Sequence, residues 1–273
     1  MSEWLEVARA EAPLIVCFPH TGLDIPSALA QRFVSPWLAR KDADHHVHRL
    51  YNFARQLGAT TLRTTISRSV IDVNRDPTGA SLYPGQATTE LCPLTTFDGE
   101  PLYRANAQPT AAEIDERRAQ YFWPYHKALQ AEIERLHAQH AQIVVYDAHS
   151  IRSRIERLFA GTLPELNLGT NDAQSCDPAL KQAVQDVITS SERSWICDGR
   201  FKGGWTTRQY AAPERGVHTL QMELACRSYL LEPDAPDESN WPAAFEPARA
   251  QALQAVLKQV LQACLAFATR RDP

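Results

Sequence analysis

Short apolar runs that could form buried strands alternate along this chain with segments of helical periodicity. The strand-like runs cover residues 14–18, 60–66, 70–73, 142–146 and 217–224. Apolar residues recur at helical spacing over 25–39, 43–57, 111–141, 178–190 and 243–269, and Pro124 should kink or restart the third of these helices. Because alternating strands and helices favour parallel pairing, the pattern predicts an α/β, three-layer architecture, a mostly parallel mixed sheet with helices on both faces.

Composition excludes several classes of protein. The 273 residues carry a formal net charge of −4 and are 44% apolar, so we expect one domain over residues 1–273. A membrane span needs about 18 consecutive apolar residues, and neither such a run nor a secretory signal is present, which favours a cytoplasmic protein. No Lys/Arg-rich block indicates binding to nucleic acid or to a membrane surface. The sequence does not indicate an oligomeric state.

Six cysteines stand far apart and contain no C-x-x-C pair. This spacing is typical of reduced, buried thiols and not of a disulfide framework or a structural zinc site. They are Cys17, Cys92, Cys176, Cys197, Cys226 and Cys264.

Polar residues follow or end several of the predicted strands. His20 comes after the first, Asp72 to Arg75 run from the end of the third into the residues that follow it, and Asp147 to Ser150 come after the fourth, while Glu223 lies at the end of the fifth. The carboxyl ends of parallel strands meet at one edge of a sheet, so these groups should lie close together. Catalytic zinc sites use about three His, Asp or Glu ligands with a carboxylate nearby, which makes His20 and His149 candidate ligands.

Each of these residues also has a purely structural interpretation. A single histidine at a strand end often caps the chain, and Asn74 with Arg75 could form a turn with a surface ion pair. Glu223 is different, because a carboxylate inside the apolar run 220–224 is costly without a partner, and such carboxylates cluster at active sites. Asp147 is a possible hydrogen-bond partner for the ring N–H of His149.

A third metal ligand is less clearly indicated. The segment 42–48 contains two aspartates and three histidines, and one of its acidic residues, Asp42 or Asp44, is the best candidate. These aspartates could instead stabilise the start of the following helix. Asp24, four residues after His20, is the competing choice. The segment 76–101, rich in Pro, Gly and Thr, predicts a long ordered loop that covers a site.

Taken together, these motifs resemble the N-formylglutamate amidohydrolase family. The resemblance runs from about residue 13 to about residue 265. The family is similar in fold to zinc carboxypeptidases and aspartoacylase, which implies a zinc-exopeptidase-like sheet. The motifs that carry the resemblance are 19–22 with Pro26, 42–44, Arg68 with 72–75, 147–150, 203–206 and 221–224.

The resemblance also implies a metal site. His20 and His149 correspond to zinc ligands of the relatives. The acidic ligand of the relatives stands three residues after the first histidine, where this chain has Leu23, so Asp44 is assigned in its place, with Asp24 and His46 as alternatives. Zn²⁺ is the expected ion, although imidazole and carboxylate ligands also suit Ni, Co and Fe.

The roles implied for the other residues describe an amide hydrolase. Glu223 corresponds to the carboxylate that activates the metal-bound water, and Arg68 to an arginine that polarises the scissile carbonyl. Asn74 and Arg75 match a pair that holds the α-carboxylate of the substrate.

The implied reaction is hydrolysis of N-formyl-L-glutamate to formate and L-glutamate in histidine catabolism. A dicarboxylate substrate needs a second cationic anchor, for which Arg154 and Arg208 are favoured over Arg152. Two alternatives are a hydrolase of another N-acyl amino acid and a non-catalytic carboxylate-binding protein on the same fold.

Overall fold

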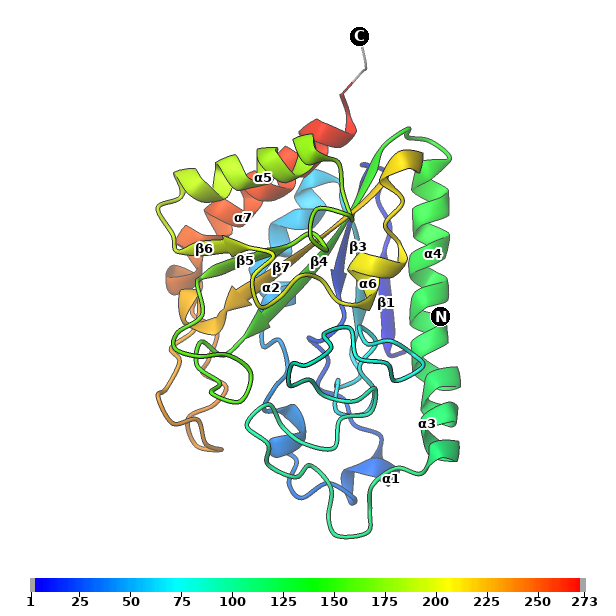
Figure 1. Ribbon diagram of the computed structural model, residues 1–273, viewed down its shortest axis with the longest axis vertical. Helices are drawn as coiled ribbons and strands as arrows, with labels where there is room; N and C mark the ends of the chain where they lie inside the picture. Colours follow the sequence, from blue (N-terminus) through cyan, green and yellow to red (C-terminus); the bar gives the residue numbers. More distant parts are fainter. Residues whose placement is uncertain (1–2, 271–273) are drawn as a thin grey trace.

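A single mixed sheet organises the protein (Figure 1). The computed structural model describes residues 3–270. Within them the strand order is β1-β3-β2-β4-β7-β5-β6. The β1–β3 and β5–β7 pairs are antiparallel and the other four pairs are parallel, so the predicted mostly parallel sheet is confirmed. The strands are Leu5–Ala8 (β1), Leu14–Phe18 (β2), Thr60–Thr64 (β3), Ile143–Ile151 (β4), Leu166–Gly169 (β5), Trp195–Cys197 (β6) and Val217–Ala225 (β7).

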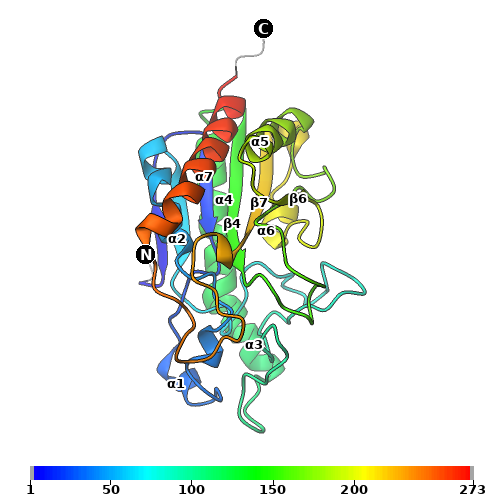
Figure 2. The ribbon, with the colours of Figure 1, turned by 90° about the vertical axis from the view of Figure 1, so that its left-hand side faces the viewer.

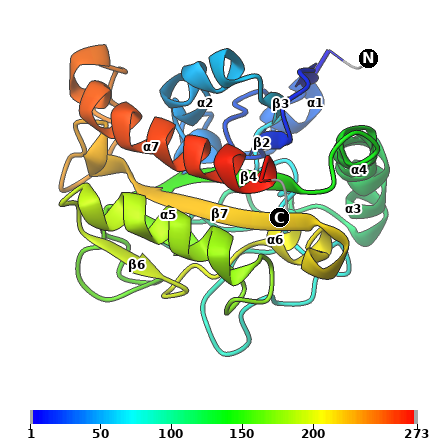
Figure 3. The same cartoon turned by 90° about the horizontal axis from the view of Figure 1, so that it is seen from above.

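Helices cover both faces of this sheet and complete the three layers. Apolar residues of α2, α5 and α7 pack on one face and those of α4 on the other. In Figure 2 α7 and α5 face the viewer and α4 lies behind the sheet, and Figure 3 shows α5 beside α7. No helix within residues 3–270 is long and apolar enough to cross a membrane. The helices are Ser27–Ala30 (α1), Val47–Leu50 (α2), Ala111–Arg117 (α3), Trp123–His137 (α4), Pro178–Ser190 (α5), Trp205–Gln209 (α6) and Pro247–Ala268 (α7).

The central strand β4 is buried along its whole length but changes character halfway. Alternate side chains of a strand point to opposite faces. One face of β4 carries Val144, Tyr146 and Ala148 in the core against α5 and α7 and becomes polar only at Ser150. The other face begins with Ile143 and Val145 in the core against α4 and continues with Asp147 and His149. The carboxyl half of this second face is therefore where the fold places polar chemistry.

Several strand predictions need correction. The run 142–146 continues to Ile151, because β4 keeps its parallel pairing with β7 as far as Ala225. Residues 70–73 are a buried turn and not a strand: the Val70 N–H bonds the Ser67 carbonyl, and the Asp72 N–H bonds the Leu91 carbonyl. The sequence analysis missed β1, β5 and β6, each of which has four residues or fewer.

Two helix predictions are wrong in extent. The segment 25–39 contains only α1 and a turn of 3₁₀-helix from Leu38 to Arg40, because Pro36 cannot donate a backbone hydrogen bond. The segment 43–57 divides into α2 and the 3₁₀-helix Asn52–Leu57, with Gly58 at its end in the left-handed region (φ 74°).

The other helix predictions fare better. The predicted restart near Pro124 is confirmed, since a π-helical turn over Arg118–Phe122 separates α3 from α4. All six cysteines are free, as predicted, and Cys197 alone is not fully buried.

Candidate metal and catalytic site

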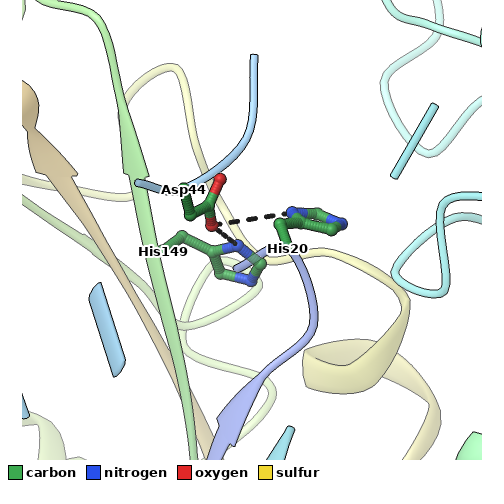
Figure 4. A group of neighbouring side chains, drawn as sticks. All are labelled: His20, Asp44 and His149. Atoms are coloured by element: carbon green, nitrogen blue, oxygen red, sulfur yellow. Dashed lines mark hydrogen bonds and ion pairs between the residues drawn. The ribbon is translucent and has the colours of Figure 1, made fainter. Parts of the chain in front are cut away.

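Three side chains from distant parts of the chain converge at the carboxyl ends of β2 and β4 (Figure 4). They are His20, which follows β2, Asp44, from the turn before α2, and His149 of β4. One ligand atom from each lies within 4.8 Å of the others, and all three side chains are buried. The Asp44 Oδ2 atom is 2.9 Å from His149 Nδ1 and 3.7 Å from His20 Nδ1.

The backbone explains why Asp44 reaches the two histidines. Its N–H donates to the carbonyl of His20 over 2.9 Å, which ties the turn before α2 to the end of β2. The two alternatives lie elsewhere: Asp24 is exposed, and the ring of His46 is tilted against that of Phe245, with 5.8 Å between the ring centres. Among the described residues, the group that could hold a metal therefore contains Asp44 and neither alternative.

A second carboxylate contacts the Nε2 atom of each histidine. His20 Nε2 lies 2.6 Å from Asp72 Oδ1, and His149 Nε2 lies 3.0 Å from Asp147 Oδ2, the partner predicted for it. A proton on each Nε2 would leave both Nδ1 lone pairs directed toward Asp44. Two buried atoms of this group, His20 Nδ1 and Asp44 Oδ1, have no hydrogen-bond partner among residues 3–270. These donors fit a divalent cation of the Zn²⁺ type.

The charges around this centre are strongly coupled. Burial alone would lower the pKa of His149, but Asp147 and Asp44 raise that pKa well above its usual value. Burial would raise the pKa of Asp72, but His20, Arg68 and Arg75 hold it well below its usual value. Carboxylates and cations thus stabilise each other's charged forms.

Asn74 connects Asp72 and Asp147, which we call the outer carboxylates because each contacts a histidine on the side away from Asp44. Its side-chain Nδ2 donates to Asp147 Oδ2 over 2.8 Å, its Oδ1 accepts from the Thr206 N–H over 2.8 Å, and its own N–H donates to Asp72. The fit is tight, because a Cβ added to Gly204 would approach the Asn74 amide to 2.5 Å. The polar groups of Asn74 are therefore engaged within the protein.

Two of the predicted arginines lie next to the same carboxylates. Arg68 Nη2 is 2.7 Å from Asp72 Oδ2, and its guanidinium carbon is 4.8 Å from the centre of the Phe97 ring. Arg75 Nε is 3.3 Å from the same Asp72 oxygen, and its Nη2 donates to Thr89. Both arginines line the pocket beside the metal group.

Sheet register places Glu223 beside this group. In the parallel β4–β7 pair His149 lies opposite Glu223, and Asp147 lies opposite Gln221, so all four face the same side. Gln221 accepts from the Gly204 N–H and directs its Nε2 to Glu223 Oε2 at 3.4 Å. Burial, opposed by His149 and reinforced by Asp44, raises the pKa of Glu223 to about 8.

The pocket contains two of the predicted arginines and one that was not predicted. It is lined by Arg68, Arg75 and Arg200, together with Tyr83 and Phe97 from the predicted covering loop. That loop is the cyan-to-green segment in the lower half of Figure 1.

The expected second anchors, Arg154 and Arg208, lie outside the pocket. Arg154 is 67% exposed and pairs with Asp234 in a separate depression. Arg208 donates to the Gly203 carbonyl beside Tyr83, and Arg152 is bound by Asp42 and Asp98.

The sequence analysis missed Arg200 and Tyr83. The only sequence signal for Arg200 is its place three residues before the 203–206 motif. The direction of a side chain in such a loop depends on contacts with distant segments, which a local pattern does not contain.

Comparison with known proteins agrees with this geometry. The family model for N-formylglutamate amidohydrolase matches residues 12–230. The N-formylglutamate deformylases of Pseudomonas aeruginosa and Pseudomonas putida are 41% and 40% identical to the chain, each over 99% of both proteins.

Two solved structures share the fold. The N-formylglutamate amidohydrolase of Ralstonia eutropha JMP134 superposes with a TM-score of 0.79 at 22% identity, covering 97% of this chain and 98% of the other. A gene product of Agrobacterium tumefaciens superposes with a TM-score of 0.72 at 16% identity, covering 97% and 96%. The family model and the two deformylases decide the assignment, and the chain belongs to the N-formylglutamate amidohydrolase family.

Proposed function

We propose that this amidohydrolase hydrolyses N-formyl-L-glutamate to formate and L-glutamate in a metal-dependent reaction. One observation supports the proposal most: His20, His149 and Glu223 line a single pocket together with three arginines. A metal site, a buried carboxyl group and cationic side chains are what hydrolysis of an anionic amide requires. Two relatives of 41% and 40% identity bear the name N-formylglutamate deformylase, which supports the choice of substrate.

We assign the metal to His20, Asp44 and His149. When bound, a divalent cation such as Zn²⁺ acts as a Lewis acid that polarises the formyl oxygen and makes water a stronger acid. Asp72 and Asp147 would orient the two imidazole rings through their Nε2 atoms, at 2.6 and 3.0 Å. Asn74 was expected to contact the substrate, but its engaged amide supports a role in positioning Asp147 and the 203–206 segment.

Glu223 is the proposed proton carrier. It removes a proton from the attacking water while the water oxygen bonds to the formyl carbon, and it returns that proton to the amide nitrogen as the C–N bond breaks. Burial raises the pKa of Glu223 to about 8, and a divalent cation held by the neighbouring residues would favour the ionised carboxylate that accepts the water proton. Register with His149 keeps Glu223 beside the metal group.

Arg68 and Arg75 complete the proposed machinery. Arg68 would stabilise the negative charge that develops on the formyl oxygen. Arg75 would bind the α-carboxylate through its planar guanidinium, which matches a carboxylate in shape. We place the enzyme in the cytoplasm, as the sequence favours, and its reaction in histidine breakdown, as the family resemblance implies.

An assay for the free amino acid, with formate and acetate identified separately, tests the proposal. Purified protein is stripped of metal, reconstituted with Zn²⁺, and assayed with N-formyl-L-glutamate, N-formyl-L-aspartate and N-acetyl-L-glutamate. We expect metal-dependent formate release that is fastest with N-formyl-L-glutamate. Faster turnover of N-acetyl-L-glutamate would identify a different N-acyl amino-acid hydrolase. Tight glutamate binding with no turnover of any substrate would identify a non-catalytic binding protein.

A further inference from the structure

Arg200 has a different electrostatic environment from the other two arginines of the pocket. Arg68 and Arg75 share Asp72, at 2.7 and 3.3 Å. No carboxylate among residues 3–270 lies within ion-pair distance of Arg200, whose hydrogen bonds go to the carbonyls of Leu158 (2.9 Å) and Ala87 (2.8 Å). The pocket therefore holds one guanidinium whose charge is not neutralised by a neighbouring side chain.

The protein holds this guanidinium firmly in place. The two carbonyls fix its Nε and Nη2 atoms, and its central carbon lies 5.4 Å from the Tyr83 ring and 5.2 Å from the Phe201 ring. Tyr83 is itself anchored, because its hydroxyl donates to the Gly203 carbonyl over 2.8 Å. Within the described chain no acceptor meets the remaining Nη1 donor. A half-buried arginine that is fixed in this way is preorganised for an anion.

The pocket between Arg200 and the metal group also contains apolar surface. Phe97, Ile151, Leu158 and Phe201 line it, and the first two are buried. Burial and the nearby positive charge of Arg75 lower the pKa of Arg200, so the two cations share one region. Such a surface suits the methylene groups of a substrate whose two ends are both anionic.

We propose that Arg200 binds the side-chain carboxylate of the substrate and thereby selects an acidic N-formyl amino acid. The assignment deepens the proposed deformylase function and rests on it. Arg75 takes the α-carboxylate, Arg200 takes the side-chain carboxylate, and Phe97 and Ile151 contact the methylene groups between them. Arg200 thus takes the place for which Arg154 and Arg208 were predicted.

Substrate pairs provide the test. The wild type, Arg200→Gln and Arg154→Gln are assayed with N-formyl-L-glutamate and with N-formyl-L-glutamine, which has the same shape but a neutral side chain. Arg154→Gln is the matched control, because Arg154 is exposed and outside the pocket. We expect the wild type and the control to favour the acidic substrate by about 10- to 100-fold in kcat/KM, which is the range for one charged hydrogen bond. Arg200→Gln should bring the ratio close to one, mainly through KM for N-formyl-L-glutamate.

Two results would overturn the inference. In the first, Arg200→Gln slows both substrates equally and leaves the ratio unchanged, so that Arg200 only supports the loops at Leu158 and Ala87. In the second, Arg75→Gln abolishes the preference and Arg200→Gln does not. Because both substrates are measured on the same preparation, partial unfolding of a variant does not affect the ratio.

Failure of the proposed function gives a different result. A wild type that releases no formate from N-formyl-L-glutamate contradicts the deformylase proposal. Calorimetry with L-glutamate and L-glutamine then tests Arg200 independently. A preference for glutamate that Arg200→Gln removes supports the carboxylate subsite, and equal binding of the two amino acids by the wild type overturns it.

Discussion

The two ends of the pocket differ in how their charges are balanced. At the metal end, His20 and His149 each contact two carboxylates, and Arg68 and Arg75 share one of these. At the other end, Arg200 contacts only carbonyl oxygens and aromatic rings among the described residues. Buried charges that pair with each other fix the positions of their side chains, whereas an unpaired cation is free to bind an anionic ligand. This contrast is what the proposed division predicts, with chemistry at the first end and substrate selection at the second.

The largest effect should come from removing the carboxylate shared by the two histidines. Asp44→Ala deletes the oxygen that lies 2.9 Å from His149 Nδ1, and we expect loss of bound metal and of all measurable activity. Metal content by mass spectrometry checks this, with His149→Ala as the reference and circular dichroism as the control for folding. Stoichiometric metal in Asp44→Ala would show that a different residue is the third ligand.

Glu223→Gln should leave the metal in place and remove the proton carrier. The amide keeps the size of the side chain and its contact with Gln221. We expect kcat to fall by about 10³-fold, within the range for a lost general base, with metal content unchanged. Full activity in this variant would contradict the mechanism proposed for Glu223.

The outer carboxylates should matter less than the ligands. Asp147→Asn keeps a polar group near His149 Nε2 but removes its charge, so metal affinity should fall by about 10- to 100-fold. Titration with a competing chelator measures the change. Asp234→Asn, at an exposed carboxylate in a separate depression, is the matched control and should have no effect. Equal affinities in wild type and Asp147→Asn would show that the metal end does not depend on its outer carboxylates.

A smaller effect, on the free energy of unfolding, is expected from His126. His126 of α4 bonds the Val73 carbonyl and the Tyr210 hydroxyl, and burial lowers the pKa of this histidine from 6.5 to about 4. As the pH falls, His126 takes up a proton near pH 6.5 in the unfolded chain but only near pH 4 in the folded protein. The stabilisation that neutral His126 gives the folded protein is therefore complete above pH 6.5 and is lost as the pH falls toward 4.

Urea unfolding of wild type and His126→Gln between pH 7.5 and pH 4 isolates this contribution. We expect the wild type to lose about 3 kcal/mol more than the variant over this range. Identical pH profiles would mean that His126 does not stay neutral in the folded protein. The comparison of variants is needed because His45 and His48 also have pKa values lowered to about 4 by burial.

The sequence predicted elements well where their signal is local. Helix α5 matches its predicted range, because Asp177 caps it and Pro178 starts it. The prediction failed at residues 70–73, because a buried turn and a buried strand can both be apolar. The bonds from Val70 N–H to the Ser67 carbonyl and from Asp72 N–H to the Leu91 carbonyl distinguish them. Strand β6 has only three residues, which is too short for an alternating pattern, and it is recognised as a strand only by its pairing with β5.

The same distinction applies to the site. The convergence of His20, His149 and Glu223 could be anticipated because strand ends limit where these side chains lie. Asp44 was one of several acidic candidates, because it joins the group through a bond from its N–H to the His20 carbonyl, which no local pattern contains. The second anchor could not, because arginines in loops have long side chains whose direction depends on tertiary contacts. Arg154 points to Asp234 in the exposed depression, while Arg200 is turned into the pocket by the carbonyls of Leu158 and Ala87.

The register of β4 against β7 has a consequence for how the family can diversify. His149 and Glu223 are paired on adjacent parallel strands, so their separation depends on the interstrand spacing of about 4.8 Å and not on any loop. Loops that line the rest of the pocket can therefore change length or sequence without altering the distance between a metal ligand and the proposed proton carrier. Such an arrangement would allow new acyl amino acids to be accepted while the hydrolytic chemistry stays the same.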